Sequence, residues 1–152
     1  MIWWMQLLII VVCGAILHLP EFVDAVDFAD CGSTGAIVVS VDVFPCNNDP
    51  CTLVKGALTT FTVNFVARGG ADSVYSNVRD ASAGSMLVHF PQSDICPNLA
   101  PPCPILAGET YSFSYTATVA QSFQSGPLSI RWEILYGNGA KFMCVDFQTV
   151  IA

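Results

Sequence analysis

Residues 111–119 read Tyr111-Ser112-Phe113-Ser114-Tyr115-Thr116-Ala117-Thr118-Val119, and their alternation is the clearest structural signal in the chain. Every odd-numbered position is aromatic or aliphatic, and every even-numbered position is serine or threonine. Because successive side chains of a strand point to opposite faces of a sheet, this period of two predicts a strand that is buried on one face and solvated on the other. We therefore expect a half-buried strand at residues 111–119.

The same alternation of apolar and polar residues predicts three further strands, at residues 37–43, 60–66 and 128–134. In the first of these, Ile37 and Val39 are expected to face the core together with Val41 and Val43. The sequence Asn-Gly at 138–139 suits a tight hairpin, which predicts one more strand at residues 141–150.

Weaker signals predict strands at residues 73–78 and 86–90. Residues 96–104 contain four prolines and are expected to form a loop with neither strand nor helix, because proline lacks the N–H donor that both structures need. Seven or eight short strands with one apolar face each predict an all-β fold, an antiparallel β-sandwich. The spacing of a true immunoglobulin domain is absent, since Trp132 lies 101 residues after Cys31 and only 12 before Cys144.

Seven cysteines occur in the chain, and six of them follow the N-terminal apolar segment. Six cysteines allow 15 pairings in principle. Two pairs are close in sequence, Cys46 with Cys51 and Cys96 with Cys103, and short loops close at little entropic cost. That leaves Cys31 to join Cys144, which would clamp the two ends of the domain.

The N-terminal segment is expected to be a signal peptide. Residues 2–19 are almost wholly apolar, and the small residues Val23 and Ala25 fit cleavage after Ala25. We therefore interpret residues 1–25 as the signal peptide and residues 26–152 as one domain. A membrane anchor is the alternative, since about 18 apolar residues is the lower limit for a span. Secretion into an oxidising compartment would allow the cysteines to pair.

Charge and chemistry argue against several classes of function. The chain has 5 basic and 12 acidic residues, and the basic ones are scattered, so a nucleic-acid partner is not expected. His89 is the only histidine after the signal peptide, and its apolar neighbours place it in a strand, so we expect no catalytic residue and no enzyme. The cysteine spacings lack the close pairs of zinc sites, so neither a metal nor a cofactor is expected.

Several short motifs follow one another along residues 26–152. They are Asp30-Cys31-Gly32-Ser33, Pro45-Cys46 with Pro50-Cys51, Leu53-Val54-Lys55-Gly56, Phe90-Pro91, Cys103-Pro104-Ile105, Thr110-Tyr111-Ser112-Phe113, Trp132 and Cys144. Taken in this order, they resemble the ML lipid-recognition family, and most of all its Niemann–Pick type C branch of sterol carriers. The mite group 2 allergens are also similar. The resemblance covers essentially the whole of the expected domain.

This resemblance implies an immunoglobulin-like β-sandwich whose sheets hold one lipid between them, and it implies the same three disulfides. It also implies which residues line the lipid cavity: Phe90, Val119 and Phe123 at the mouth, Leu128, Ile130 and Trp132 deeper, and Phe61, Val63, Val145 and Phe147 on the opposite wall. Sterol carriers of the family often have tyrosine where Phe123 stands.

The function implied by the resemblance is that of a monomeric carrier. It would bind a sterol or a similar hydrophobic lipid in the extracellular space or the lysosomal lumen and pass it to a membrane or a lipid-transfer receptor. A microbial-lipid recognition protein of innate immunity is the alternative, and a carrier of fatty acids or semiochemicals is a variant. Glycolipid phosphates would need basic residues at the mouth, which only Arg68 and Arg79 could supply, so the carrier is favoured.

Overall fold

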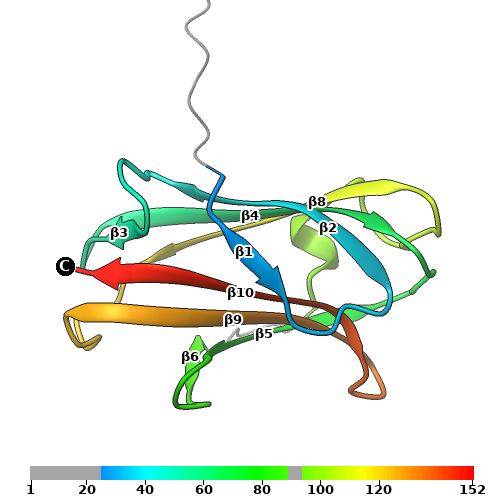
Figure 1. Cartoon of the computed structure of the whole chain (residues 1–152). Coiled ribbons are helices and arrows are strands. Elements are labelled where there is room, and N and C mark those ends of the chain that lie inside the picture. The colour runs from blue at the N-terminus through cyan, green and yellow to red at the C-terminus, as the bar shows by residue number, and fades with distance from the viewer. Residues whose placement is uncertain (1–24, 89–93) are drawn as a thin grey trace, which may run out of the picture.

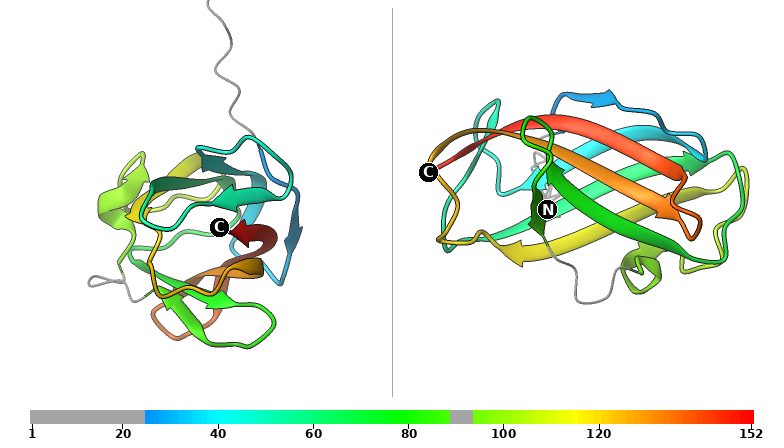
Figure 2. Two further views of the ribbon diagram at one scale, coloured as in Figure 1. Left: turned by 90° about the vertical axis from the view of Figure 1, so that its left-hand side faces the viewer. Right: turned by 90° about the horizontal axis from the view of Figure 1, so that it is seen from below.

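Two β-sheets pack face to face in the computed structural model, which describes residues 25–88 and 94–152 (Figures 1 and 2). All of the expected signal peptide except Ala25 lies outside these described residues, as do His89 and Phe90. Within the described ranges, no helix is long and apolar enough to cross a lipid bilayer.

One sheet has four antiparallel strands in the order β2-β4-β8-β7, and it forms the upper layer in Figure 1. The alternating residues 111–119 supply β8, so their apolar side chains point down toward the other sheet. The bounds of these strands are β2 (Ala36–Phe44), β4 (Leu58–Ala67), β7 (Leu99–Ala100) and β8 (Thr110–Thr118).

The other sheet has six strands, of which β10, β9, β5 and β6 form the lower layer in Figure 1. Its main path runs β1-β10-β9-β5-β6, and β3 also pairs with β10. Every pair is antiparallel except β3 with β10, which is parallel. The bounds are β1 (Phe28–Asp30), β3 (Cys51–Leu53), β5 (Val74–Asp80), β6 (Met86–Val88), β9 (Gly126–Tyr136) and β10 (Lys141–Ile151).

The β-sandwich predicted from the alternation is confirmed, but the predicted number of strands is too low. The described residues form ten strands; the three that were not predicted, β1, β3 and β7, are three residues long or shorter, and such lengths show no periodicity. One of these, β7, lies within residues 96–104, where a loop was expected. There a 3-10 turn η1 (Cys96–Asn98) precedes Leu99 and Ala100, which pair with Phe113 and Ser112 of β8. Leu99 and Ala100, which are not prolines, thus add a two-residue strand to the edge of the four-stranded sheet.

The prediction for β2 is correct only in its second half. Val41 and Val43 are buried, whereas Ile37 and Val39 are 45% and 59% exposed. The register of β2 against β4 shifts just after Val38, and such a bulge adds one residue and reverses the faces before it. The prediction that Ile37 and Val39 face the core is therefore wrong.

The sandwich is filled with aromatic rings at the end that carries the β9–β10 hairpin. Phe65 of β4 stacks on Tyr111 of β8, with ring centroids 5.7 Å apart. Phe142 of β10 meets Phe65 edge to face at 5.7 Å and Tyr136 of β9 at 5.3 Å. Phe65 and Phe142 are fully buried, so this end is a dense core that holds the two sheets together.

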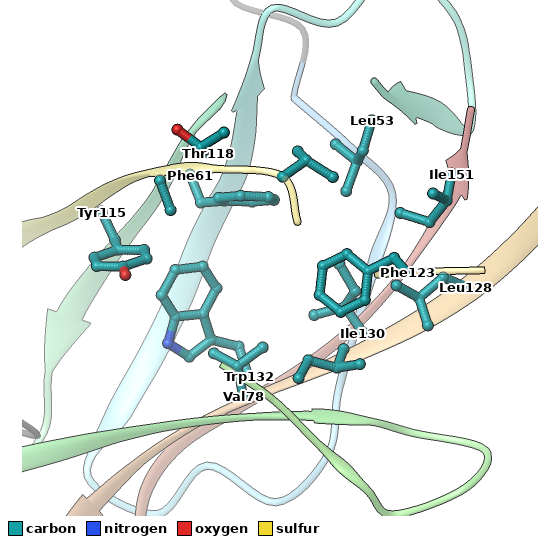
Figure 3. A pocket seen from close by; sticks show the side chains of 13 residues that line it. Leu53, Phe61, Val78, Tyr115, Thr118, Phe123, Leu128, Ile130, Trp132 and Ile151 are labelled. Carbon is teal, nitrogen blue, oxygen red and sulfur yellow. The ribbon is translucent and has the colours of Figure 1, made fainter. Parts of the chain in front are cut away.

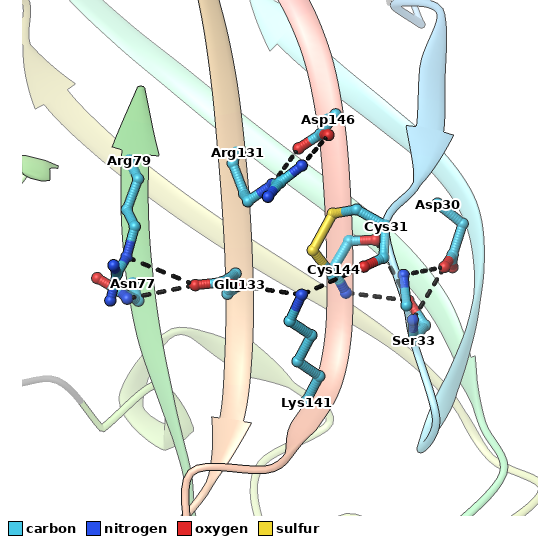
Figure 4. Close-up of a disulfide and its surroundings, with 11 residues drawn as sticks. Asp30, Cys31, Ser33, Asn77, Arg79, Arg131, Glu133, Lys141, Cys144 and Asp146 are labelled. Carbon is cyan, nitrogen blue, oxygen red and sulfur yellow. Dashed lines mark hydrogen bonds and ion pairs between the residues drawn. A yellow bond between two sulfur atoms is a disulfide. The ribbon is translucent and has the colours of Figure 1, made fainter. Parts of the chain in front are cut away.

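All three predicted disulfides are present: Cys31–Cys144, Cys46–Cys51 and Cys96–Cys103. The first joins the end of β1 to β10 across 113 residues of sequence (Figure 4). Hydrogen bonds reinforce it, because the N–H of Cys31 donates to the carbonyl of Cys144 at 3.0 Å and the N–H of Cys144 donates to Ser33 Oγ at 2.9 Å. The residues that follow β1 are thus fixed to β10.

Replacing Cys31 and Cys144 together by serine should destabilise the protein more than replacing Cys46 and Cys51. In the chain-entropy model a closed loop of more than 100 residues contributes about 4–5 kcal/mol, and a loop of about six residues contributes about 2 kcal/mol. Denaturant unfolding of the two double variants measures both losses. An equal loss from the two would contradict this account.

Candidate functional site between the two sheets

A cavity opens between the sheets close to the C-terminal residues (Figure 3). This end of the sandwich lies opposite the β9–β10 hairpin (Figure 2). Side chains from both sheets and from the β8–β9 loop surround it. The lining residues are Leu53, Phe61, Val78, Leu87, Tyr115, Ala117, Thr118, Val119, Phe123, Leu128, Ile130, Trp132 and Ile151. Nearly all of them are aliphatic or aromatic.

The two main walls follow from the strand alternation. On one side Phe61 of β4 and Tyr115 of β8 are cross-strand partners, so their rings lie next to each other on the inner face of the four-stranded sheet. On the other side Ile130 and Trp132 of β9 occupy successive inward positions, and Val78 of β5 pairs with Trp132. Figure 3 shows the rings of Phe61, Tyr115 and Trp132 grouped at one side of the cavity.

Trp132 closes the inner end of the cavity. Its indole is 2% exposed and contacts three rings of the facing sheet edge to face: Phe61, Phe113 and Tyr115, with centroids 5.8, 5.5 and 6.4 Å away. Its Nε1–H donates to Ser76 Oγ of β5 at 2.7 Å. The indole is therefore held from both sheets, which fixes the boundary between the filled core and the cavity.

The mouth is formed by residues from three separate chain segments. Leu53 ends β3, Ile151 ends β10, and Phe123 projects from the β8–β9 loop. In Figure 3 these three side chains lie together with Leu128, away from Trp132. At this end Phe123 and Leu128 are half-buried, whereas Leu53 and Ile151 are buried.

The chemistry of the cavity is that of an apolar container. The polar side-chain groups of the lining residues are the hydroxyls of Tyr115 and Thr118 and the indole N–H of Trp132, which donates to Ser76. Across the described part of the chain, no three histidine, cysteine, aspartate or glutamate side chains converge to hold a metal ion. A hydrophobic molecule is the ligand that such walls bind, because its transfer from water is favourable and needs no polar partner.

The cavity is small in this conformation. About 70 Å³ is open to the centre of a water molecule, and one water needs roughly 10–15 Å³ on that measure. Pockets for drug-sized molecules typically have about 300–1,000 Å³. A large ligand can enter only if side chains at the mouth move apart, and half-buried Phe123 and Leu128 are the ones least held by packing.

Six of the ten residues predicted to line a lipid cavity lie around this one: Phe61, Val119, Phe123, Leu128, Ile130 and Trp132. Phe90 lies outside the described residues. Val63, Val145 and Phe147 are buried in the core and are absent from the lining. Val63 is the next inward residue of β4 beyond Phe61, and Phe147 packs behind Phe61 with ring centroids 6.4 Å apart.

Sequence reasoning missed seven lining residues: Leu53, Val78, Leu87, Tyr115, Ala117, Thr118 and Ile151. Tyr115 and Ala117 could have been found, because they occupy the odd positions of the alternating strand 111–119. Leu53 and Ile151 end their strands and Leu87 lies within the three-residue strand β6, so the sequence contains no periodic signal that would place them beside Phe123.

Charged side chains lie on the outside of the second sheet, away from the cavity (Figure 4). Glu133 of β9 is flanked by Arg79 Nε at 3.6 Å and Lys141 Nζ at 3.5 Å. The guanidinium of Arg131 contacts the carboxylate of Asp146 at 2.6 Å, and this hydrogen bond raises the pKa of Arg131. Three of the five basic residues in the chain are thus neutralised by carboxylates on this outer face.

Comparison with known proteins identifies the same fold and family. The profile of the ML domain matches residues 25–151. The NPC intracellular cholesterol transporter 2 of Danio rerio is 30% identical over 131 residues, which cover 84% of this chain and 86% of that protein. Homolog a of this transporter in Drosophila melanogaster is 25% identical, over 93% of this chain and 96% of its own.

Among solved structures, a Niemann-Pick type C2 protein from Japanese carpenter ant has the same fold. Its TM-score is 0.74 at 19% sequence identity, and the match covers 83% of this chain and 99% of the ant protein. Two facing sheets, an apolar cavity at one end and a domain profile that spans nearly all described residues agree with one another. The chain belongs to the ML domain family.

Proposed function

We propose that this protein is a carrier that holds one sterol, or a lipid of similar size, between its two sheets and releases it to a membrane or a lipid-transfer receptor. The single observation that carries the proposal is the apolar cavity bounded by Phe61, Trp132 and Phe123. The relatives named as cholesterol transporters support a sterol as the cargo. Binding without catalysis, by a monomer, is part of the proposal.

The energetics of such a carrier come from desolvation. Burial of apolar surface contributes roughly 25 cal/mol per Å², so about 300 Å² of buried ligand surface supplies roughly 7–8 kcal/mol before the costs of association. A rigid, mostly apolar ligand loses little internal entropy on binding. The walls offer few hydrogen-bonding groups, so shape rather than polar contacts would select the ligand.

The compartment that fits this function is oxidising. Three disulfides within a domain of this size are typical of secreted and lumenal proteins. We infer that the protein works outside the cell or in the lumen of an organelle such as the lysosome, where sterol carried in the cavity would cross an aqueous space between membranes.

Phe123→Ala should weaken the binding of a fluorescent sterol by about 1–3 kcal/mol, the range for burying one such side chain against a ligand. The matched control is Phe44→Ala, because Phe44 is 66% exposed on β2 and does not line the cavity. Titration of both variants and the parent protein with the sterol measures the difference. Equal affinities for the three proteins would place the ligand somewhere else.

Trp132→Ala should cost about 3–5 kcal/mol of unfolding free energy in the lipid-free protein, since it deletes a buried ring that contacts both sheets. Phe123→Ala should cost only about 1 kcal/mol or less, because its side chain is half-buried in a loop. Urea unfolding of the two variants checks this contrast. If Phe123→Ala proved as damaging as Trp132→Ala, Phe123 would be a core residue and not a mobile part of the mouth.

A further inference from the structure

The rim of the cavity is formed where the β8–β9 loop meets the β3–β4 turn. Main-chain hydrogen bonds join them, since the N–H of Gly56 donates to the carbonyl of Val119 at 2.8 Å and the N–H of Val119 donates to the carbonyl of Ala57 at 3.0 Å. Each segment also supplies a lining residue, Leu53 just before the turn and Phe123 within the loop. Polar groups on these two segments therefore lie beside the mouth.

Three side chains with N–H or O–H groups gather at this junction. The ammonium of Lys55 donates to Ser125 Oγ at 2.9 Å, from the turn to the loop. The amide of Gln121 lies directly over Gly56, so close that a Cβ at Gly56 would be 2.6 Å from its Nε2. Gly56 has φ +79, a conformation that glycine adopts without strain, so the turn accommodates Gln121.

The charge at the rim differs from that of the rest of the chain. Residues 50–71 and 110–132, which form the turn and the loop with their flanking strands, contain no aspartate or glutamate, although the chain has 12 acidic residues. Arg79, which the sequence suggested for the mouth, instead pairs with Glu133 on the outer face of the other sheet, where the described ion pairs of Arg131 and Lys141 also lie. The ammonium of Lys55 has a neutral hydroxyl as its partner.

The C-terminal residue lies near Lys55, and main-chain hydrogen bonds hold it there. An oxygen of Ala152 accepts the backbone N–H of Lys55 at 2.9 Å, and the N–H of Ala152 donates to the carbonyl of Leu53 at 3.0 Å. These bonds extend the pairing of β3 with β10. The side chain of Lys55 is directed to Ser125 and not to this terminus.

We propose that Lys55, together with Ser125, is the head-group subsite of the cavity and favours lipids with an oxyanion head, a carboxylate or a sulfate. This inference rests on the proposed function. A lipid whose apolar body fills the cavity must leave a charged head in contact with water, because no lining residue is charged and burying an unpaired charge is costly. At the mouth, the head group meets the ammonium of Lys55. Among the described residues, no carboxylate lies within ion-pair distance of this ammonium.

Two matched ligand pairs test this proposal. Oleate is compared with oleyl alcohol, and cholesteryl sulfate with cholesterol, each below its critical micelle concentration and at low salt. Within a pair the apolar body is the same and only the head differs. The affinity ratio within each pair is measured for the parent protein, Lys55→Gln, Lys55→Arg and Lys141→Gln, the last being the same change at a lysine on the outer face.

A solvent-exposed ion pair alters affinity by up to about fivefold. We expect the parent protein, Lys55→Arg and Lys141→Gln to prefer the anionic member of at least one pair by about two- to fivefold. Lys55→Gln should lose this preference while keeping its affinity for the neutral member. Raised salt should reduce the preference, because exposed charges are screened. A preference within the oleate pair would indicate a fatty acid as the anionic ligand, and a preference within the cholesteryl sulfate pair would indicate a sterol.

Other outcomes would overturn the subsite. An anionic preference that persists in Lys55→Gln would assign the head to another group, and the absence of any preference in the parent protein would remove the subsite altogether. If Lys55→Gln weakened neutral and anionic lipids equally, Lys55 would only shape the mouth through its bond to Ser125. Failure of the parent protein to bind oleyl alcohol and cholesterol would contradict the proposed function itself, which separates the two hypotheses.

Discussion

The contact of Trp132 with both sheets is the interaction on which the interior depends. Its indole is bonded to Ser76 within its own sheet and meets Phe113 and Phe61 of the facing sheet edge to face. On one side of this ring the interior is filled by the aromatic cluster around Phe65. On the other side it opens into the cavity.

The stability of the fold and the openness of the cavity are supplied by different regions. Dense packing, the Cys31–Cys144 disulfide and the ion pairs around Glu133 belong to the core and the outer face of the second sheet. The cavity end is closed by strand termini and by the β8–β9 loop, which has fewer buried contacts. The proposed binding of a larger ligand requires side chains at this end to move, and this division would leave the core intact.

The strands of this protein were largely predictable, and the cavity walls were partly so. The alternation of residues 111–119 and 128–134 yields β8 and β9 and places Ile130 and Trp132 on the inner face. The same reasoning failed at Ile37 and Val39, because a bulge after Val38 depends on pairing with β4 and leaves no mark in the local pattern. It also missed β7, where two residues gain their partners only from the edge of β8.

Local sequence determined which side chains face inward, because the pleat of a strand assigns alternate residues to opposite faces whatever the partner. Spacing alone also favoured the disulfide pairing. Whether the inward residues fill the space or leave a cavity was decided by how the two sheets pack, since Val63 and Phe61 have the same pattern yet only Phe61 reaches the cavity. The rim likewise exists only because β3, β10 and the β8–β9 loop meet in space, bringing Lys55 to Ser125 across 70 residues of sequence.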